Sequence, residues 1–127
     1  MKITEVNTPK APKAVGPYVQ ANKVGNLIFC SGQLGINPAT GEFVEGDVQA
    51  QTRQALTNAR AIMNEAGLDL NNVIKTTVFL SDMANFAAMN EIYAEFFSEP
   101  YPARSAVAVK TLPKNALVEV ECIAVRP

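Results

Sequence analysis

The chain has 127 residues, of which 48% are hydrophobic, and 11 basic against 12 acidic side chains leave a formal net charge of −1. This length suits a single domain, residues 1–127, with a core of its own. The balanced charge argues against binding to nucleic acid through a basic surface. Because no histidine occurs, neither a Ser-His-Asp nor a Cys-His nucleophile can be built, and no histidine-ligated metal site. Proton transfer near neutral pH must use a carboxylate, lysine, tyrosine, cysteine or bound water.

In chain order, the first predicted elements are two strands and a helix. Residues 8–17 contain three prolines and are predicted to be irregular. Strands are predicted over 18–24 and 27–31, joined by a turn at residues 25–26. The clearest helix begins at Asp47 and ends at Gly67, because apolar residues recur there at three- and four-residue spacing.

The second half of the chain continues with a β-branched strand over 73–80 and a helix over 86–97, whose methionine and aromatic stripe is predicted to be core. Two strands, 104–110 and 117–125, close the chain. The order is β-β-α-β-α-β-β, with room for one extra short strand. It predicts an α+β fold, with a mostly antiparallel sheet and two helices on one face.

Alternation within the last two strands predicts which side chains share a face. In the last strand the wholly apolar set, which should face the helices, is Val118, Val120, Cys122 and Ala124. The opposite set carries Glu119 and Glu121. In the strand before it, Val107 and Val109 take one face and Arg104 the other. If the valines of both strands share the core, Arg104 and Glu119 lie together on the second face of the sheet.

That second face is predicted to be too apolar to remain in water. Besides the two carboxylates it carries either Leu27 and Phe29 or their neighbours Ile28 and Cys30. We therefore expect a homo-oligomer that buries this face, with the charged pair at or near a subunit boundary.

The two cysteines and the N-terminus bear on the compartment. Cys30 and Cys122 are far apart in the sequence, each inside an apolar run, and form no Cys-x-x-Cys motif. We expect two small buried side chains rather than a disulfide framework. Residues 1–16 lack the apolar stretch of a signal peptide, and no run approaches the length of a membrane span. The expected location is the cytoplasm.

Three positions are candidates for chemistry. Arg104, at the start of a strand, can grip a carboxylate or phosphate through two parallel hydrogen bonds; an ordinary surface ion pair is the alternative. Glu119, in mid-strand among apolar neighbours, must pair with a cation or have a raised pKa, so a general base and a structural partner both stay open. A glycine after a strand, such as Gly32, often lets a backbone N–H approach a ligand or another chain.

Several segments carry a family resemblance. They are Ala14-Val15-Gly16-Pro17-Tyr18, Phe29-Cys30-Ser31-Gly32-Gln33, Asn37-Pro38-Ala39-Thr40-Gly41, Val73 to Leu80, Asn90, Pro102-Ala103-Arg104-Ser105-Ala106-Val107, Leu112-Pro113-Lys114 and Val118-Glu119-Val120-Glu121. In this combination the chain resembles the Rid family, the YjgF-type reactive intermediate deaminases, and its RidA subgroup most. The resemblance spans essentially the whole chain, in order and without large gaps.

The resemblance implies a chorismate-mutase-like α+β fold, assembled as a homotrimer with three sites between subunits. It implies a 2-iminobutanoate/2-iminopropanoate deaminase, which hydrolyses reactive 2-imino acids to 2-keto acids and ammonia. Those imino acids are tautomers of 2-aminoacrylate-type enamines, so the reaction protects against enamine damage. No metal or organic cofactor takes part in this reaction.

The resemblance also implies roles for particular residues. Arg104 holds the substrate carboxylate, and Glu119 orients or deprotonates the water that adds to the C=N carbon. The pocket is lined by Tyr18, Ser31, the backbone around Gly32, and Asn90. Tyr18 is expected to reach across from a neighbouring subunit. Many RidA members have a cysteine where this chain has Ala106, so thiol-dependent behaviour is not expected here.

Two other functions stay open. A non-catalytic trimer would use the same Arg104 clamp to sense a keto or imino acid as a ligand-binding or regulatory protein. A ribonuclease or translation inhibitor is the third possibility. The balanced charge and the lack of a basic stripe or of histidine argue against it, so no nucleic-acid partner is expected.

Overall fold

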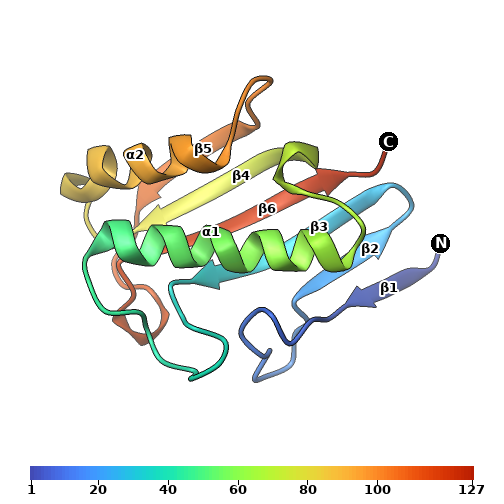
Figure 1. The fold of residues 1–127 in the computed structure, drawn as a ribbon, viewed down its shortest axis with the longest axis horizontal. Helices are drawn as coiled ribbons and strands as arrows, with labels where there is room; N and C mark the ends of the chain where they lie inside the picture. Colours follow the sequence, from blue (N-terminus) through green and yellow to red (C-terminus); the bar gives the residue numbers. More distant parts are fainter.

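A single six-stranded sheet organises the computed structural model, which describes all of residues 1–127 (Figure 1). Its strands are β1 (Ile3–Val6), β2 (Ala21–Val24), β3 (Leu27–Leu34), β4 (Val73–Leu80), β5 (Ala103–Ala108) and β6 (Val118–Val125). Across the sheet they run β1-β2-β3-β6-β4-β5, and only the β4–β5 pair is parallel. The predicted mostly antiparallel sheet is confirmed, and the extra short strand is β1.

Two helices, α1 (Val48–Glu65) and α2 (Phe86–Phe96), lie over one face of this sheet (Figure 1). The carboxylate of Asp47 accepts hydrogen bonds from the backbone N–H groups of Gln49 and Ala50 at 3.0 and 3.3 Å, which caps the first turn of α1. Gly67 has a φ of +81°, a left-handed conformation that ends the helix. The predicted α+β architecture and the start and end of its first helix are confirmed. No helix combines the length and the apolar character needed to cross a membrane.

The core lies between the helices and the sheet. The alternate residues of β6 predicted to face the helices are all buried. Ile28 and Cys30 of β3 are buried as well, so Leu27 and Phe29 belong to the second face. Cys30 lies directly opposite Cys122 on the neighbouring strand, and both are free thiols. The prediction of two buried cysteines is therefore confirmed, but their adjacency was not predicted.

The predicted facing of β5 is wrong. The β4–β5 register pairs Arg104 with Thr76, which is buried and is itself paired with Cys122 on the core side. Arg104 therefore lies on the helix-bearing face. Val107 lies on the second face, where it is 45% exposed and follows the same row as Glu119. β5 is the edge strand and pairs with β4 alone, so Val107 is not forced into the core.

This register has a consequence for the predicted site. Arg104 and Glu119 lie on opposite faces of the sheet in one chain, not together on the second face. The second face is of mixed character, because Lys75, Thr77 and Glu121 lie on it beside exposed apolar side chains. Its exposed side chains include Leu27, Phe29 and Val107.

Candidate active site

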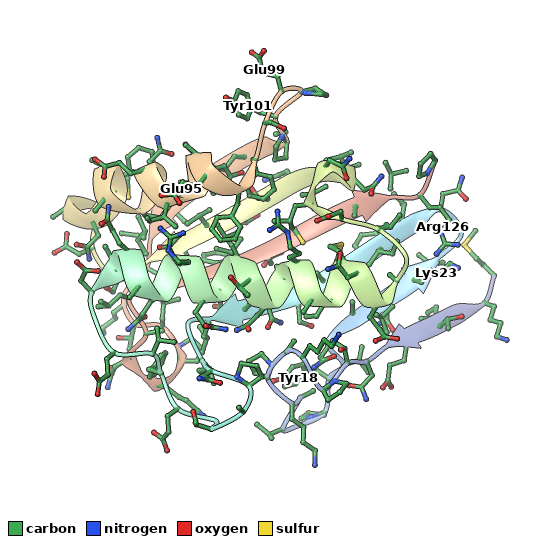
Figure 2. All side chains as sticks on the ribbon, viewed as in Figure 1. Tyr18, Lys23, Glu95, Glu99, Tyr101 and Arg126 are labelled. Carbon is green, nitrogen blue, oxygen red and sulfur yellow. The ribbon has the colours of Figure 1, made fainter.

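A cleft of about 660 Å³ opens where the ends of β3 and β6 meet three loops. Four of the predicted site residues line it: Tyr18, Ser31, Gly32 and Glu119. The wall is completed by several apolar residues and by two lysines, Lys13 and Lys114. Tyr18 is half exposed on the N-terminal loop, below α1 in the view of Figure 2. This cleft therefore gathers a carboxylate, two hydroxyl groups and two cations from segments far apart in the sequence.

A bulge in β3 builds the floor of the cleft. The register with β6 shifts between Cys30 and Gln33, so that Ser31 and Gly32 together face one residue of the partner strand. The Ser31 hydroxyl donates to the carbonyl of Val19 at 2.6 Å, and the Ser31 N–H donates to the carbonyl of Gln20 at 2.9 Å. Because its proton is engaged, the Ser31 oxygen is set to accept a hydrogen bond from a ligand.

Gly32 allows the Glu119 carboxylate to lie against the strand. A Cβ added at Gly32 would overlap this carboxylate, coming within 2.7 Å of its Cδ. The sequence predicted that a ligand or another chain comes close to the backbone at this glycine. The group that approaches is a side chain of the same subunit.

Glu119 is the one carboxylate among the residues that line the cleft. Burial raises its pKa above the ordinary value, and the negative charge of Glu121 raises this pKa further. The two ion pairs of the chain, Arg53–Glu95 and Arg60–Asp69, do not involve it. Within the chain Glu119 thus has a raised pKa and no cationic partner, which suits a general base better than a structural ion pair.

The other two predicted residues form a separate group on β5 and α2. Arg104 donates from Nη1 to Oδ1 of Asn90 at 2.6 Å. The guanidinium carbon lies 4.7 Å from the ring centre of Tyr93 and 5.4 Å from that of Phe86. Arg104 is otherwise exposed and makes no ion pair within the chain. Its remaining N–H groups are available to an anionic ligand.

The structure therefore divides the predicted site into two halves. In Figure 2, Tyr18 lies on one side of α1, and Glu95, which follows Asn90 on α2, lies on the other. Sequence reasoning missed Phe86 and Tyr93, which it placed in the core. Their spacing of four and three residues from Asn90 puts all three on one face of α2, and that spacing was the available signal. No group of three or more His, Cys, Asp or Glu side chains is arranged to hold a metal ion.

Comparisons with known proteins identify relatives that match nearly the whole chain. A protein named 2-iminobutanoate/2-iminopropanoate deaminase from Escherichia coli is 50% identical over 124 residues, 95% of this chain and 96% of that protein. The chloroplastic Reactive Intermediate Deaminase A (RidA) of Arabidopsis thaliana is 52% identical over 119 residues, 94% of this chain and 64% of that protein. The crystal structure of E. coli TdcF with bound serine superposes with a TM-score of 0.93 at 46% identity, covering 98% of this chain and 99% of that one.

The comparison with family models gives the family directly. The model described as Endoribonuclease L-PSP matches residues 8–126, nearly the whole chain. The predicted resemblance is thereby confirmed. The chain belongs to this L-PSP family, the Rid or YjgF-type family, and its relatives include proteins named as RidA-type deaminases.

Proposed function

We propose that this protein is a RidA-type enzyme that hydrolyses 2-imino acids such as 2-iminobutanoate and 2-iminopropanoate to 2-keto acids and ammonia. The observation that carries the proposal is the Glu119 carboxylate, whose raised pKa and lack of a cationic partner suit it to accept a proton in a cleft. The names of the relatives support the same activity. The serine held by the E. coli neighbour carries the carboxylate and small side chain expected of the substrate class.

Arg104 and Glu119 lie on opposite faces of the sheet, so one chain cannot bring both to the same substrate. The proposed site therefore needs an assembly of several chains. In a homotrimer, Arg104 and Asn90 of one subunit would meet the cleft of Tyr18, Ser31 and Glu119 on the next. The exposed apolar side chains of the second face, Leu27, Phe29 and Val107, support such burial between subunits. Tyr18 lines the cleft of its own chain's Glu119, so it would come from a neighbouring subunit relative to Arg104.

In this site each residue has one chemical task. Arg104 binds the substrate carboxylate through two N–H groups and so fixes the C=N carbon. Glu119 accepts a proton from water as the water oxygen bonds to that carbon. With the imine protonated, the C=N π electrons pass to nitrogen and a neutral amino alcohol forms. Glu119 then returns the proton to this nitrogen and the C–N bond breaks to release ammonia. The hydroxyl oxygen becomes the carbonyl of the keto acid as its proton passes through Glu119 to the ammonia, which leaves as ammonium. In this proposal the Ser31 oxygen, whose proton is given to the Val19 carbonyl, accepts a hydrogen bond from the substrate N–H.

The test couples a threonine dehydratase to its substrate and follows imine loss in the presence of this protein. We expect the protein to accelerate release of 2-oxobutanoate above the spontaneous rate. Arg104→Ala should remove the acceleration, and Glu119→Gln should reduce it by about 10²- to 10⁴-fold. Arg60→Ala, which removes an exposed arginine of a surface ion pair, is the matched control and should act like the wild type.

Two results would redirect the assignment. Equal acceleration by the wild type and Arg104→Ala would overturn the catalytic proposal and favour a non-catalytic protein that binds keto or imino acids. Cleavage of RNA by the purified protein would favour the endoribonuclease named in the family description. The net charge of −1 and the absence of histidine argue against that activity in this chain.

The pH dependence of the reaction should report on Glu121. A carboxylate base works only when ionised, so activity should fall as the pH drops through the raised pKa of Glu119. Glu121→Gln removes the repulsion that helps to raise this pKa, and the acidic limb of the profile should move to lower pH. Glu65→Gln, at an exposed position on α1, should leave the limb in place. Direct titration of the Glu119 carboxyl carbon by NMR gives the same shift without reliance on turnover, and an unmoved pKa would contradict the prediction.

A further inference from the structure

The guanidinium of Arg104 rests on a ring that is itself held in place. Arg104 belongs to the edge strand β5 and is exposed, and an exposed arginine samples many rotamers that ligand binding must then restrict. Here its guanidinium carbon lies 4.7 Å from the ring centre of Tyr93, within the range of a cation–π interaction. Asn90 accepts a hydrogen bond from one edge of the same group at 2.6 Å. Two contacts from α2 therefore restrain one side chain of β5.

The Tyr93 ring cannot swing away freely. Its hydroxyl shares a 2.8 Å hydrogen bond with Oγ1 of Thr76, which is fully buried. Thr76 is the direct β4 neighbour of Arg104 in the sheet. The ring of Phe97 packs against that of Tyr93 with the ring centres 4.5 Å apart. The phenol is thus tied to the strand next to the arginine and braced by a second aromatic ring.

The charge state of Tyr93 suits this role. Burial raises the pKa of its phenol, although the Thr76 hydrogen bond and the Arg104 charge act in the opposite direction. A neutral ring attracts the cation through its face, so it does not form an ion pair that would occupy the N–H groups. The contact with the ring uses none of the guanidinium N–H groups, so those not bonded to Asn90 stay available to bind a carboxylate.

We propose that Tyr93, locked by Thr76, is a positioning residue that holds Arg104 ready for the substrate carboxylate, with Phe86 and Asn90 completing the support. The role of the supported guanidinium rests on the proposed function. The support itself rests only on the contacts within one chain. Tyr93 touches no substrate in this scheme and acts through Arg104.

The experiment compares two variants that each remove one aromatic ring from α2. Tyr93→Leu removes the ring beneath Arg104, whereas Phe96→Leu removes a ring that lies 5.5 Å from the guanidinium of Arg60 instead. Binding of 2-oxobutanoate, the unreactive product, is measured by calorimetry. We expect Tyr93→Leu to weaken it by about tenfold and Phe96→Leu to leave it unchanged. Tyr93→Phe, which keeps the ring but loses the Thr76 bond, should fall between them.

Two further measurements separate positioning from a general loss of structure. The NMR signal of the Arg104 Nε–H group should lose its ring-current shift in Tyr93→Leu and keep it in Phe96→Leu. In an Arg104→Ala background, Tyr93→Leu should change 2-oxobutanoate binding no further, because its effect passes through the arginine. If Tyr93→Leu does not fold, Phe86→Leu replaces it, since Phe86 is less buried and contacts the same guanidinium.

The outcomes are distinct. Wild-type affinity in Tyr93→Leu, or an unmoved Arg104 signal, would overturn the positioning role. If the Arg104 signal moves as expected while even the wild-type protein fails to bind 2-oxobutanoate, the aromatic support stands and the proposed function fails.

Discussion

Mixed assemblies of two inactive variants, Arg104→Ala and Glu119→Gln, should regain deaminase activity that neither variant has alone. The reason is that the two residues lie on opposite faces of one sheet, so the proposed site takes them from different chains. In a cyclic trimer that contains both variants, about one of the three interfaces joins an intact Arg104 to an intact Glu119. Co-expression with two affinity tags, purification through both, and the dehydratase-coupled assay give the measurement.

The control for this mixing experiment uses a chain that carries both substitutions. Paired with Arg104→Ala chains, the double variant has no intact arginine to offer and should restore nothing. Absence of recovery in mixed assemblies of verified composition would place both residues of a site in the same chain. A monomer mass by light scattering would reject the shared site altogether.

Gly32→Ala should reduce activity by about 10²-fold, because a misplacement of about 1 Å in a catalytic group has that effect. Its added methyl group would overlap the Glu119 carboxylate and push it away from the strand. The φ of Gly32 is not in the left-handed region, so an alanine there leaves the backbone unstrained and the damage passes to Glu119. Steady-state kinetics of the coupled reaction, with thermal unfolding alongside, measure the two effects separately.

Gly35→Ala is the informative contrast. A Cβ at that position would meet the backbone of Gln51 in α1 at 2.6 Å and should lower the unfolding temperature without touching Glu119. In a Glu119→Gln background, Gly32→Ala should have little further effect on the rate. Wild-type turnover by Gly32→Ala would show that the carboxylate does not work from its position against the strand.

Local signals predicted much of this fold correctly. The bounds of α1 follow from a capping aspartate and a terminating glycine, both of which act within one turn of the helix. The facing of β6 follows from a wholly apolar set that alternates with carboxylates. In both cases the residues that determine the structure lie within a few positions of one another, so the sequence alone is enough to predict it.

The facing of β5 could not be predicted in the same way. Apart from Arg104 and Ser105 the strand contains only alanine and valine, which suit either face. Its register is set by pairing with β4, some 30 residues earlier in the chain. The bulge at Ser31 and Gly32 was missed for a related reason, because it depends on how β3 meets β6. Residue types identified the members of the candidate site, and only the topology revealed that one chain holds them in two separate halves.

Tyr93 illustrates a different limit. Its ring is buried, so its place in an apolar stripe correctly predicted a core residue. The same ring also supports a cation on a strand that follows in the chain. A pattern of hydrophobic spacing cannot reveal this second contact, because it describes one helix and not what lies beside it.

The adjacent thiols of β3 and β6 can be used to measure how often these two strands separate. Cys30 and Cys122 are its only cysteines, and they face each other beside the bulge that forms the floor of the cleft. Contact with Cys122 and burial raise the pKa of Cys30 well above its ordinary value, so Cys30 is rarely a reactive thiolate while the strands stay paired. The rate at which an alkylating reagent modifies the native protein therefore measures how often these two strands separate.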